Sequence, residues 1–164
     1  MKLLTTFIFL LISSIATAQD IRLIVPYSPG GPGDRIARVV EKELTNKKHN
    51  VVVEYKAGAG GAIAAGYVAN IRNETVLMIG APGLISSSGN GYNVEDDFVL
   101  VNYIGTEPLL LVVKNDQHIR DFKDFITQAQ TKSMAYGSAG IGTGTHITGS
   151  IVAMGNTNFI HIPY

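Results

Sequence analysis

The 164-residue chain contains no cysteine, which excludes disulfides, cysteine-based zinc sites and thiol nucleophiles. It carries no net charge, because 13 basic side chains balance 13 acidic ones, so it lacks an electrostatic footprint for nucleic acid or an anionic membrane. Charged residues make up 16% of the chain and hydrophobic residues 46%, which is typical of a globular protein rather than a disordered one. The four histidines lack the spacing of a metal site, so we expect neither a metal nor a cofactor.

The sequence also has no apolar run long enough to span a bilayer, since residues 3–15 fall short of the roughly 20 residues required. Lys2 precedes this run, and the small residues Ala16 and Ala18 follow it. A positive start, an apolar centre and a small-x-small site are typical of a secretory signal peptide. We therefore predict that residues 1–18 are a signal peptide cleaved after Ala18, and that the mature chain is exported.

Short apolar runs alternate with helical patterns along the mature chain. Strands are predicted at residues 21–25, 51–53, 76–79, 99–104, 109–113, 135–138 and 159–163. Helices are predicted from residue 34 to about residue 44, and at residues 58–69, 121–131 and 144–154, with a loop at residues 86–93. Strands that are separated by crossover helices form parallel sheets, so we expect an α/β fold.

Two glycine-rich loops stand where ligands bind in such folds, beyond the carboxyl end of a strand and before a helix. The first is residues 28–34, and the second, residues 137–146, contains four glycines. A helix N-terminus presents unpaired N–H groups to an anion, and glycine lets the backbone come close to it. Ser138, Thr143 and His146 add hydroxyl and ring N–H donors. The pair of loops indicates a site for a small anion.

Other interpretations of these residues stay open. Glycines at strand–helix junctions also serve tight turns, Asp34 is a candidate helix N-cap, and His146 is a candidate first-turn helix residue. No dinucleotide fingerprint or Walker loop is complete. A hydrolase elbow around Ser138 has Tyr136 in its first glycine position, so an exported serine hydrolase using Ser138 with His146 or His161 is the alternative function.

Five short blocks between residue 21 and the last residue carry a family resemblance. They are residues 24–31 (IVPYSPGG) with Asp34, Arg35 and Ala37, residues 53–54 (VE) with 58–61 (GAGG), Tyr92 with 97–98 (DF), residues 136–143 (YGSAGIGT) with His146, and residues 161–164 (HIPY). In this order they resemble the extracytoplasmic solute receptors of tripartite tricarboxylate transporters, the family also called Bug proteins. Members of that family continue beyond the position of Tyr164, so we expect a C-terminally truncated chain.

The resemblance implies a type II periplasmic binding protein with two α/β lobes that close on a ligand. Residues 19–105 would form part of the first lobe and residues 106–164 part of the second, with the remainder of both lobes missing. Family ligands are di- and tricarboxylates, amino acids and aromatic acids. The implied protein is a monomeric, non-enzymatic periplasmic receptor whose partner is the membrane permease of the transporter. A non-functional truncated fragment of such a receptor is a further alternative.

The resemblance also implies ligand-binding residues, carried over by position. The first-lobe residues are Tyr27, Ser28, Pro29, Gly30, Gly31 and Asp34. The second-lobe residues are Ser138, Ala139, Gly140, Thr143 and His146, and Gly80 and Ala81 would lie at the pocket wall.

Overall fold

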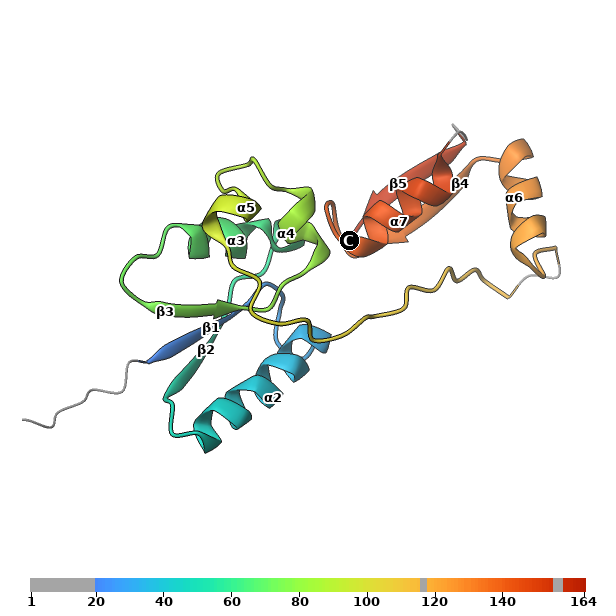
Figure 1. The fold of residues 1–164 in the computed structure, drawn as a ribbon. Helices are drawn as coiled ribbons and strands as arrows, with labels where there is room; N and C mark the ends of the chain where they lie inside the picture. Colours follow the sequence, from blue (N-terminus) through green and yellow to red (C-terminus); the bar gives the residue numbers. More distant parts are fainter. Residues whose placement is uncertain (1–19, 116–117, 155–157) are drawn as a thin grey trace, which may run out of the picture.

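The computed structural model describes residues 20–115, 118–154 and 158–164. The predicted signal peptide therefore lies outside the described residues. In chain order the elements are β1 (Ile21–Val25), α2 (Pro32–Asn46), β2 (Val51–Tyr55), the 3-10 turn η1 (Ala59–Gly61), α3 (Ala62–Ala69), β3 (Thr75–Met78), α4 (Pro82–Ser86), α5 (Val94–Asp97), α6 (Phe122–Thr131), β4 (Met134–Ser138), α7 (Gly144–Ala153) and β5 (Phe159–Pro163) (Figure 1).

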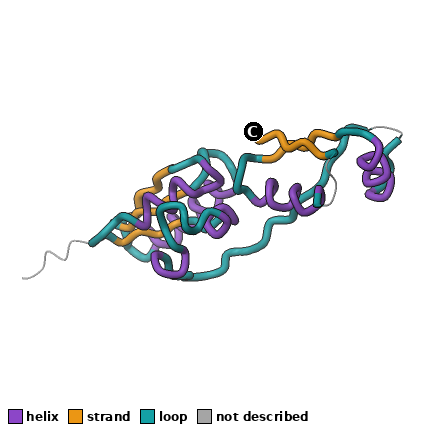
Figure 2. The backbone as a smooth tube through the Cα atoms, turned by 90° about the horizontal axis from the view of Figure 1, so that it is seen from above, coloured by secondary structure: helices purple, strands orange, loops and turns teal. Residues whose placement is uncertain are grey.

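These elements form two α/β units. The N-terminal unit, residues 20–98, contains a parallel sheet in the order β2-β1-β3, with α2 and α3 as the crossover helices. The C-terminal unit, residues 118–154 and 158–164, contains the parallel pair β4-β5 with α7 as its crossover. Figure 2 shows the two groups of strands apart from each other along the chain. The expected parallel sheets with crossover helices are therefore confirmed.

The central strand β1 carries the core of the N-terminal unit. Leu23, Ile24 and Val25 are almost completely buried, because β1 lies between two strands and under helices on both faces. On one face Leu23 and Val25 pack with Ala37 of α2. A strand that is buried on both faces requires a continuous apolar sequence, and residues 23–25 provide one.

The helices on the two faces differ in composition for a physical reason. Helix α2 is amphipathic: Ile36 and Val40 face the core, and Pro32 starts the helix where no N–H is needed. Helix α3 is rich in alanine, and Ala65 packs with Tyr92 in a second buried cluster. Small side chains let α3 lie close to the sheet and to the turns that follow it.

The helix predicted over residues 58–69 is divided in the structure. Residues 59–61 form the 3-10 turn η1 and only residues 62–69 form the α-helix α3. Gly60 and Gly61 have φ angles of 63° and 104°, which lie in the left-handed region and cannot continue a right-handed helix. The glycines therefore form a turn that positions backbone at the end of β2.

The strands predicted at residues 99–104 and 109–113 are wrong. The structure contains no strand between Phe98 and residue 115, and within the described residues the backbone of this segment has no hydrogen-bond partner. It runs from one unit to the other without lying along either sheet (Figures 1 and 2). Its apolar composition favours strands, but a strand forms only where a neighbouring strand accepts its hydrogen bonds.

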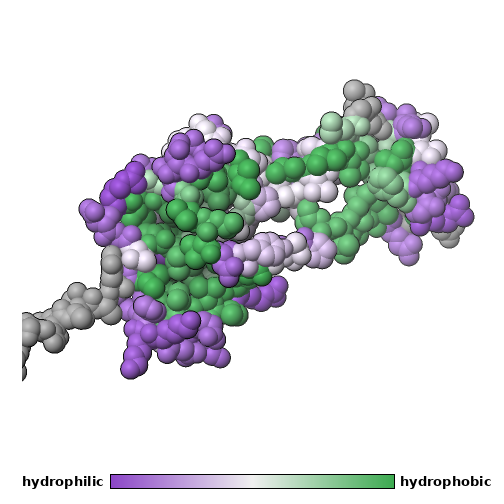
Figure 3. All heavy atoms as spheres, in the orientation of Figure 1, coloured by the Kyte–Doolittle hydropathy of each residue, from purple (hydrophilic) through white to green (hydrophobic). Residues whose placement is uncertain are grey.

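This connecting segment, residues 99–115, exposes large apolar side chains. Val99 is 88% exposed and Leu110 is 83% exposed. Figure 3 shows apolar residues openly on the surface along the part of this segment nearest the C-terminal unit. The expected lobe boundary at residues 105 and 106 falls within the segment and stays a prediction. None of the described helices is both long and apolar enough to cross a membrane.

The burial of β1 predicts a large effect for a substitution in its centre. Replacing Leu23 with Ala should lower the free energy of unfolding by about 2–5 kcal/mol, because the lost methyl groups leave a cavity under α2. Val52 of β2 is 43% exposed, so the matched Val52→Ala change should cost less than about 1 kcal/mol. Urea unfolding followed by circular dichroism measures both, and equal costs would contradict this account of the core.

Candidate functional site

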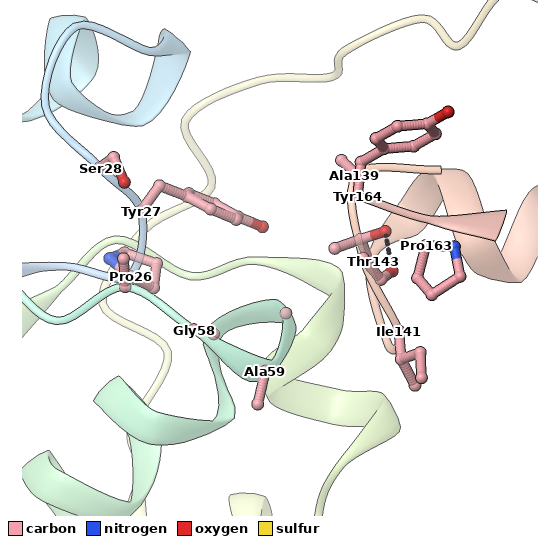
Figure 4. Close-up of a pocket in the computed structure, with 14 residues that line it drawn as sticks. Pro26, Tyr27, Ser28, Gly58, Ala59, Ala139, Ile141, Thr143, Pro163 and Tyr164 are labelled. Carbon is pink, nitrogen blue, oxygen red and sulfur yellow. Dashed lines mark hydrogen bonds between the residues drawn. The ribbon is translucent and has the colours of Figure 1, made fainter. Parts of the chain in front are cut away.

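A cavity of about 470 Å³ lies between the two units, within the size range of small-molecule sites. Fourteen residues from the ends of β1, β2, β4 and β5 line it (Figure 4). They are Pro26, Tyr27, Ser28, Ala57, Gly58, Ala59, Gly60, Gly61, Ala139, Gly140, Ile141, Thr143, Pro163 and Tyr164. Parallel strands bring their carboxyl ends to one edge of a sheet, which is why loops far apart in sequence meet here.

The cavity includes part of the predicted site. Of the predicted residues, those that line it are Tyr27, Ser28, Ala139, Gly140 and Thr143. The others lie outside its lining, and they are Pro29, Gly30, Gly31, Asp34, Gly80, Ala81, Ser138 and His146. No binding role was predicted for residues 57–61, although this glycine-rich loop follows β2 as the first predicted loop follows β1.

Asp34 holds the first loop instead of facing the cavity. Its carboxylate accepts the Gly30 N–H at 2.7 Å through one oxygen and the Tyr55 O–H at 2.7 Å through the other. Arg38 Nε also reaches it at 3.3 Å. The helix N-cap is Gly31, so the alternative role of Asp34 as an N-cap is wrong. Asp34 therefore fixes the loop to α2 and β2. Because the Gly30 N–H donates to Asp34, it is not free to donate to a ligand.

The environment of Asp34 stabilises its ionised form. The Tyr55 hydroxyl is the main cause, and the Gly30 N–H and the positive Arg38 add to it, so the pKa of Asp34 lies below its ordinary value. The same interaction raises the pKa of the Tyr55 hydroxyl. The negative charge of Asp34 is thus compensated locally, which reduces its repulsion of an anion nearby.

Tyr27 points from the N-terminal unit across the cavity toward the C-terminal unit (Figure 4). Burial and, secondly, the charge of Glu107 raise the pKa of Tyr27, so its hydroxyl stays protonated as a hydrogen-bond donor at neutral pH. Its ring covers Gly33: a Cβ atom built there would lie 3.3 Å from the ring carbon Cδ2. The start of α2 therefore supports the orientation of this side chain.

The loop after β2 supplies backbone donors. The N–H groups of Gly58, Ala59 and Gly60 have no acceptor among the described residues. Gly58 has a φ of 129°, which turns the chain sharply after β2. All three residues line the cavity, so their N–H groups are candidate donors to an oxygen anion.

Thr143 begins α7 and orders the second loop. Its hydroxyl accepts the His146 N–H at 3.3 Å as an N-cap and donates to the Gly140 carbonyl at 2.7 Å. The Ala139 N–H is held by Thr145 Oγ1 at 3.0 Å. Of the backbone N–H groups in the loop, that of Ile141 has no acceptor in the described part of the chain.

Ser138 and His146 do not line the cavity, and both accept hydrogen bonds from N–H groups of this second loop. Ser138 is only 6% exposed, and its Oγ accepts the Gly140 N–H at 3.2 Å and lies 2.7 Å from Nε2 of His161. His146 Nδ1 accepts the Gly142 N–H at 3.2 Å. The predicted ligand contacts of both residues stay predictions; in the structure Ser138 Oγ and His146 Nδ1 form hydrogen bonds that hold the loop.

The Ser138–His161 contact lacks the further parts of a hydrolytic site. His161 stacks between Tyr136 and His146, with ring centroids 4.9 and 4.3 Å away. Burial and, secondly, the neighbouring His146 lower the pKa of His161, which favours a neutral imidazole. Within the described residues no carboxylate bonds to either histidine. The stacked rings of Tyr136, His161 and His146 instead join β4, β5 and α7.

The lining contains no charged side chain. Backbone N–H groups and hydroxyls supply its polarity, and prolines, alanines and Ile141 supply apolar surface. No group of histidines and acidic residues in the described part of the chain could hold a metal ion. The arrangement can therefore bind a small anion through neutral donors, beside an apolar body.

Comparison with known families agrees with the geometry. The model of the tripartite tricarboxylate transporter family receptor matches residues 36–164. The chain belongs to this receptor family. It is 31% identical over 156 residues to the UPF0065 protein in the tcbD-tcbE intergenic region of Pseudomonas sp. (strain P51), and 30% identical over 142 residues to Protein BugT of Bordetella pertussis. These matches cover 90% and 79% of the chain but 46% and 43% of the relatives, so the chain spans about half their length.

Solved structures confirm the expected periplasmic-binding-protein fold. The R. palustris protein Rpa4515, solved with adipate, has a TM-score of 0.74 and 27% identity over 92% of this chain and 54% of its own. The periplasmic binding protein BugD has a TM-score of 0.66 and 26% identity over 89% of this chain and 52% of its own. These receptor-family neighbours are binding proteins and not enzymes.

The bonds of Asp34 predict a pH dependence of stability. Because its folded-state pKa lies below the ordinary value, its ionised form stabilises the fold above about pH 4, and this contribution is lost as the pH falls through the folded-state pKa. The Asp34→Asn variant should therefore be less stable than the parent at neutral pH, and the difference should shrink in acid.

Urea unfolding from about pH 7 to about pH 2 measures this difference. Glu95→Gln is the matched control, since Glu95 is exposed and its carboxylate has no partner in the described part of the chain. A stability difference for Asp34→Asn that stayed constant with pH would contradict the role given to this carboxylate.

Proposed function

We propose that this protein is a periplasmic solute receptor that binds a small carboxylate for a tripartite tricarboxylate transporter. The observation that carries the proposal is the cavity between the two units, walled by glycine-rich loops from both and free of charged side chains. The family membership gives the biological setting in which such a cavity would serve.

The carboxylate would be held by neutral donors. Unpaired backbone N–H groups at Gly58, Ala59 and Gly60 lie on one wall, and that of Ile141 lies on the other. The Tyr27 hydroxyl adds a protonated donor between them. Several N–H and O–H groups directed at one carboxylate can stabilise its charge without a cation, as helix N-termini and backbone nests do.

The class of ligand follows from the rest of the lining. Pro26, Ala139, Ile141 and Pro163 give apolar surface for the body of a small organic acid. A neighbour above 25% identity was solved with adipate, a carboxylate with an apolar chain. Dicarboxylates and tricarboxylates, amino acids and aromatic acids therefore form the panel to be tested.

Location and partners belong to the same proposal. A signal peptide at residues 1–18 would export the chain to the periplasm. Two structural neighbours are described as periplasmic, which supports this location. There the monomeric receptor would present its ligand to the membrane permease of the transporter. The proposal applies to the whole receptor. The relatives that this chain matches are about twice its length.

Calorimetry of the full natural protein tests the proposal with malate, citrate, adipate, glutamate and benzoate. We expect one or more of them to bind, and the Tyr27→Phe variant should bind the same acid about three- to tenfold more weakly, because one hydrogen bond is lost. Tyr103→Phe, in the exposed connecting segment, is the matched control and should leave the affinity unchanged. Binding of glucose or ribose without any of the acids would overturn the proposal.

The contact between Ser138 Oγ and His161 Nε2 at 2.7 Å permits a direct test of the alternative, a serine hydrolase. Ser138 is buried, and no described carboxylate orients the histidine, so we expect no labelling by a fluorophosphonate probe. The measurement is in-gel fluorescence of the parent and of Ser138→Ala. Labelling of the parent that disappears in Ser138→Ala would contradict the receptor assignment.

A further inference from the structure

The two units touch beside the cavity, and this contact is made almost entirely by main-chain atoms. Gly60 of η1 faces Gly142 of the second loop, and Ser86 at the end of α4 donates a hydrogen bond to the Gly142 carbonyl at 3.0 Å. Gly60 lines the cavity, whereas Ser86 does not. The Ser86 hydrogen bond connects residues 56 positions apart, and the Gly60–Gly142 approach joins the loop at residues 58–61 to the second loop.

Two glycines, Gly60 and Gly83, allow the backbones to come this close. A Cβ atom at Gly60 would lie 2.9 Å from the carbonyl carbon of Gly142 and 3.0 Å from the Ile141 oxygen, both main-chain atoms that cannot rotate away. On its other side Gly60 lies under Gly83, where a Cβ atom would overlap the Gly60 oxygen. A side chain at Gly60 would therefore force the units apart, whereas one at Gly83 would displace η1 from α4 within the N-terminal unit.

Gly142 is held through both of its backbone polar groups, the N–H and the carbonyl. Its N–H donates to His146 Nδ1 at 3.2 Å, which fixes it to α7. Its carbonyl accepts from Ser86, which fixes it to α4 of the other unit. The second loop therefore has a defined position relative to α7 and, through one hydroxyl group, relative to the N-terminal unit.

We infer that Ser86 and Gly60 are positioning residues that set the distance between the cavity wall at residues 58–61 and the wall at residues 139–143. This inference rests on the proposed function, because that distance decides whether the donors on both walls reach one carboxylate. Ser86 acts through the Gly142 peptide without contacting the ligand, and Gly60 acts through its missing side chain.

These 164 residues contain no cysteine, so two cysteines introduced into them are the only labelling sites within this part of the protein, and any cysteine elsewhere in the natural protein is replaced by serine. Spin labels on Lys42→Cys in α2 and Thr148→Cys in α7, both exposed, report the separation of the two units by electron–electron dipolar spectroscopy. The full natural protein is measured without ligand, in the parent background and with Gly60→Ala. We expect a longer or broader distance distribution in Gly60→Ala, because its Cβ atom cannot fit against Gly142.

Gly91→Ala is the matched control. Gly91 has a φ of 88°, so alanine there suffers the same left-handed strain, but nothing lies within 4 Å of its Cβ position. Its distance distribution should equal that of the parent. A Gly60→Ala distribution identical to the parent's would overturn the inference, whether or not a ligand binds.

Affinity for adipate and malate gives the functional readout on the same proteins. Gly60→Ala should weaken binding of the parent's ligand by about tenfold or more, and Ser86→Ala by about three- to tenfold, with Ser86→Thr restoring most of the loss. An unchanged affinity in both variants would overturn the inference while leaving the proposed function intact. A parent that binds none of the carboxylates in the panel would instead remove the proposed function, and the label distances would still decide the positioning role.

Discussion

Parallel pairing on both sides of β1 is the constraint on which the rest of this structure depends. Val25 pairs with Tyr55 of β2, and Ile24 pairs with Met78 of β3, so the three strands end at one edge of the sheet. The loops that follow them must then lie together. Since apolar contacts cover β1 on both faces, the register cannot shift without exposing the core, and the position of the loops is fixed by the same burial.

The sequence was sufficient to predict most helices and strands because their apolar spacing reflects which face is buried. All five observed strands and the helices α2, α6 and α7 were expected within a few residues of their observed bounds. The failure at residues 99–104 and 109–113 has a physical cause. Apolar, β-branched composition reports that a segment favours an extended, buried state, but whether it forms a strand depends on a partner that local sequence does not specify.

The candidate site was predicted in position but not in detail. Glycines next to predicted strand ends indicated two of the loops that form the cavity. Spacing could not indicate which polar groups face a ligand, because Asp34 and Ser138 are taken up in bonds within their own loops. Those bonds depend on left-handed backbone at glycines such as Gly30 and Gly140, which a residue pattern permits but does not determine.

The ring of Tyr27, which rests on Gly33, makes the shape of the cavity depend on the first turn of α2. Gly33 is buried in the first turn of α2 and contributes nothing to the cavity wall. A methyl group at that position would nevertheless lie 3.3 Å from the ring carbon Cδ2, so the ring would have to move by a few tenths of an ångström. The shape of the cavity therefore depends on a residue that does not line it.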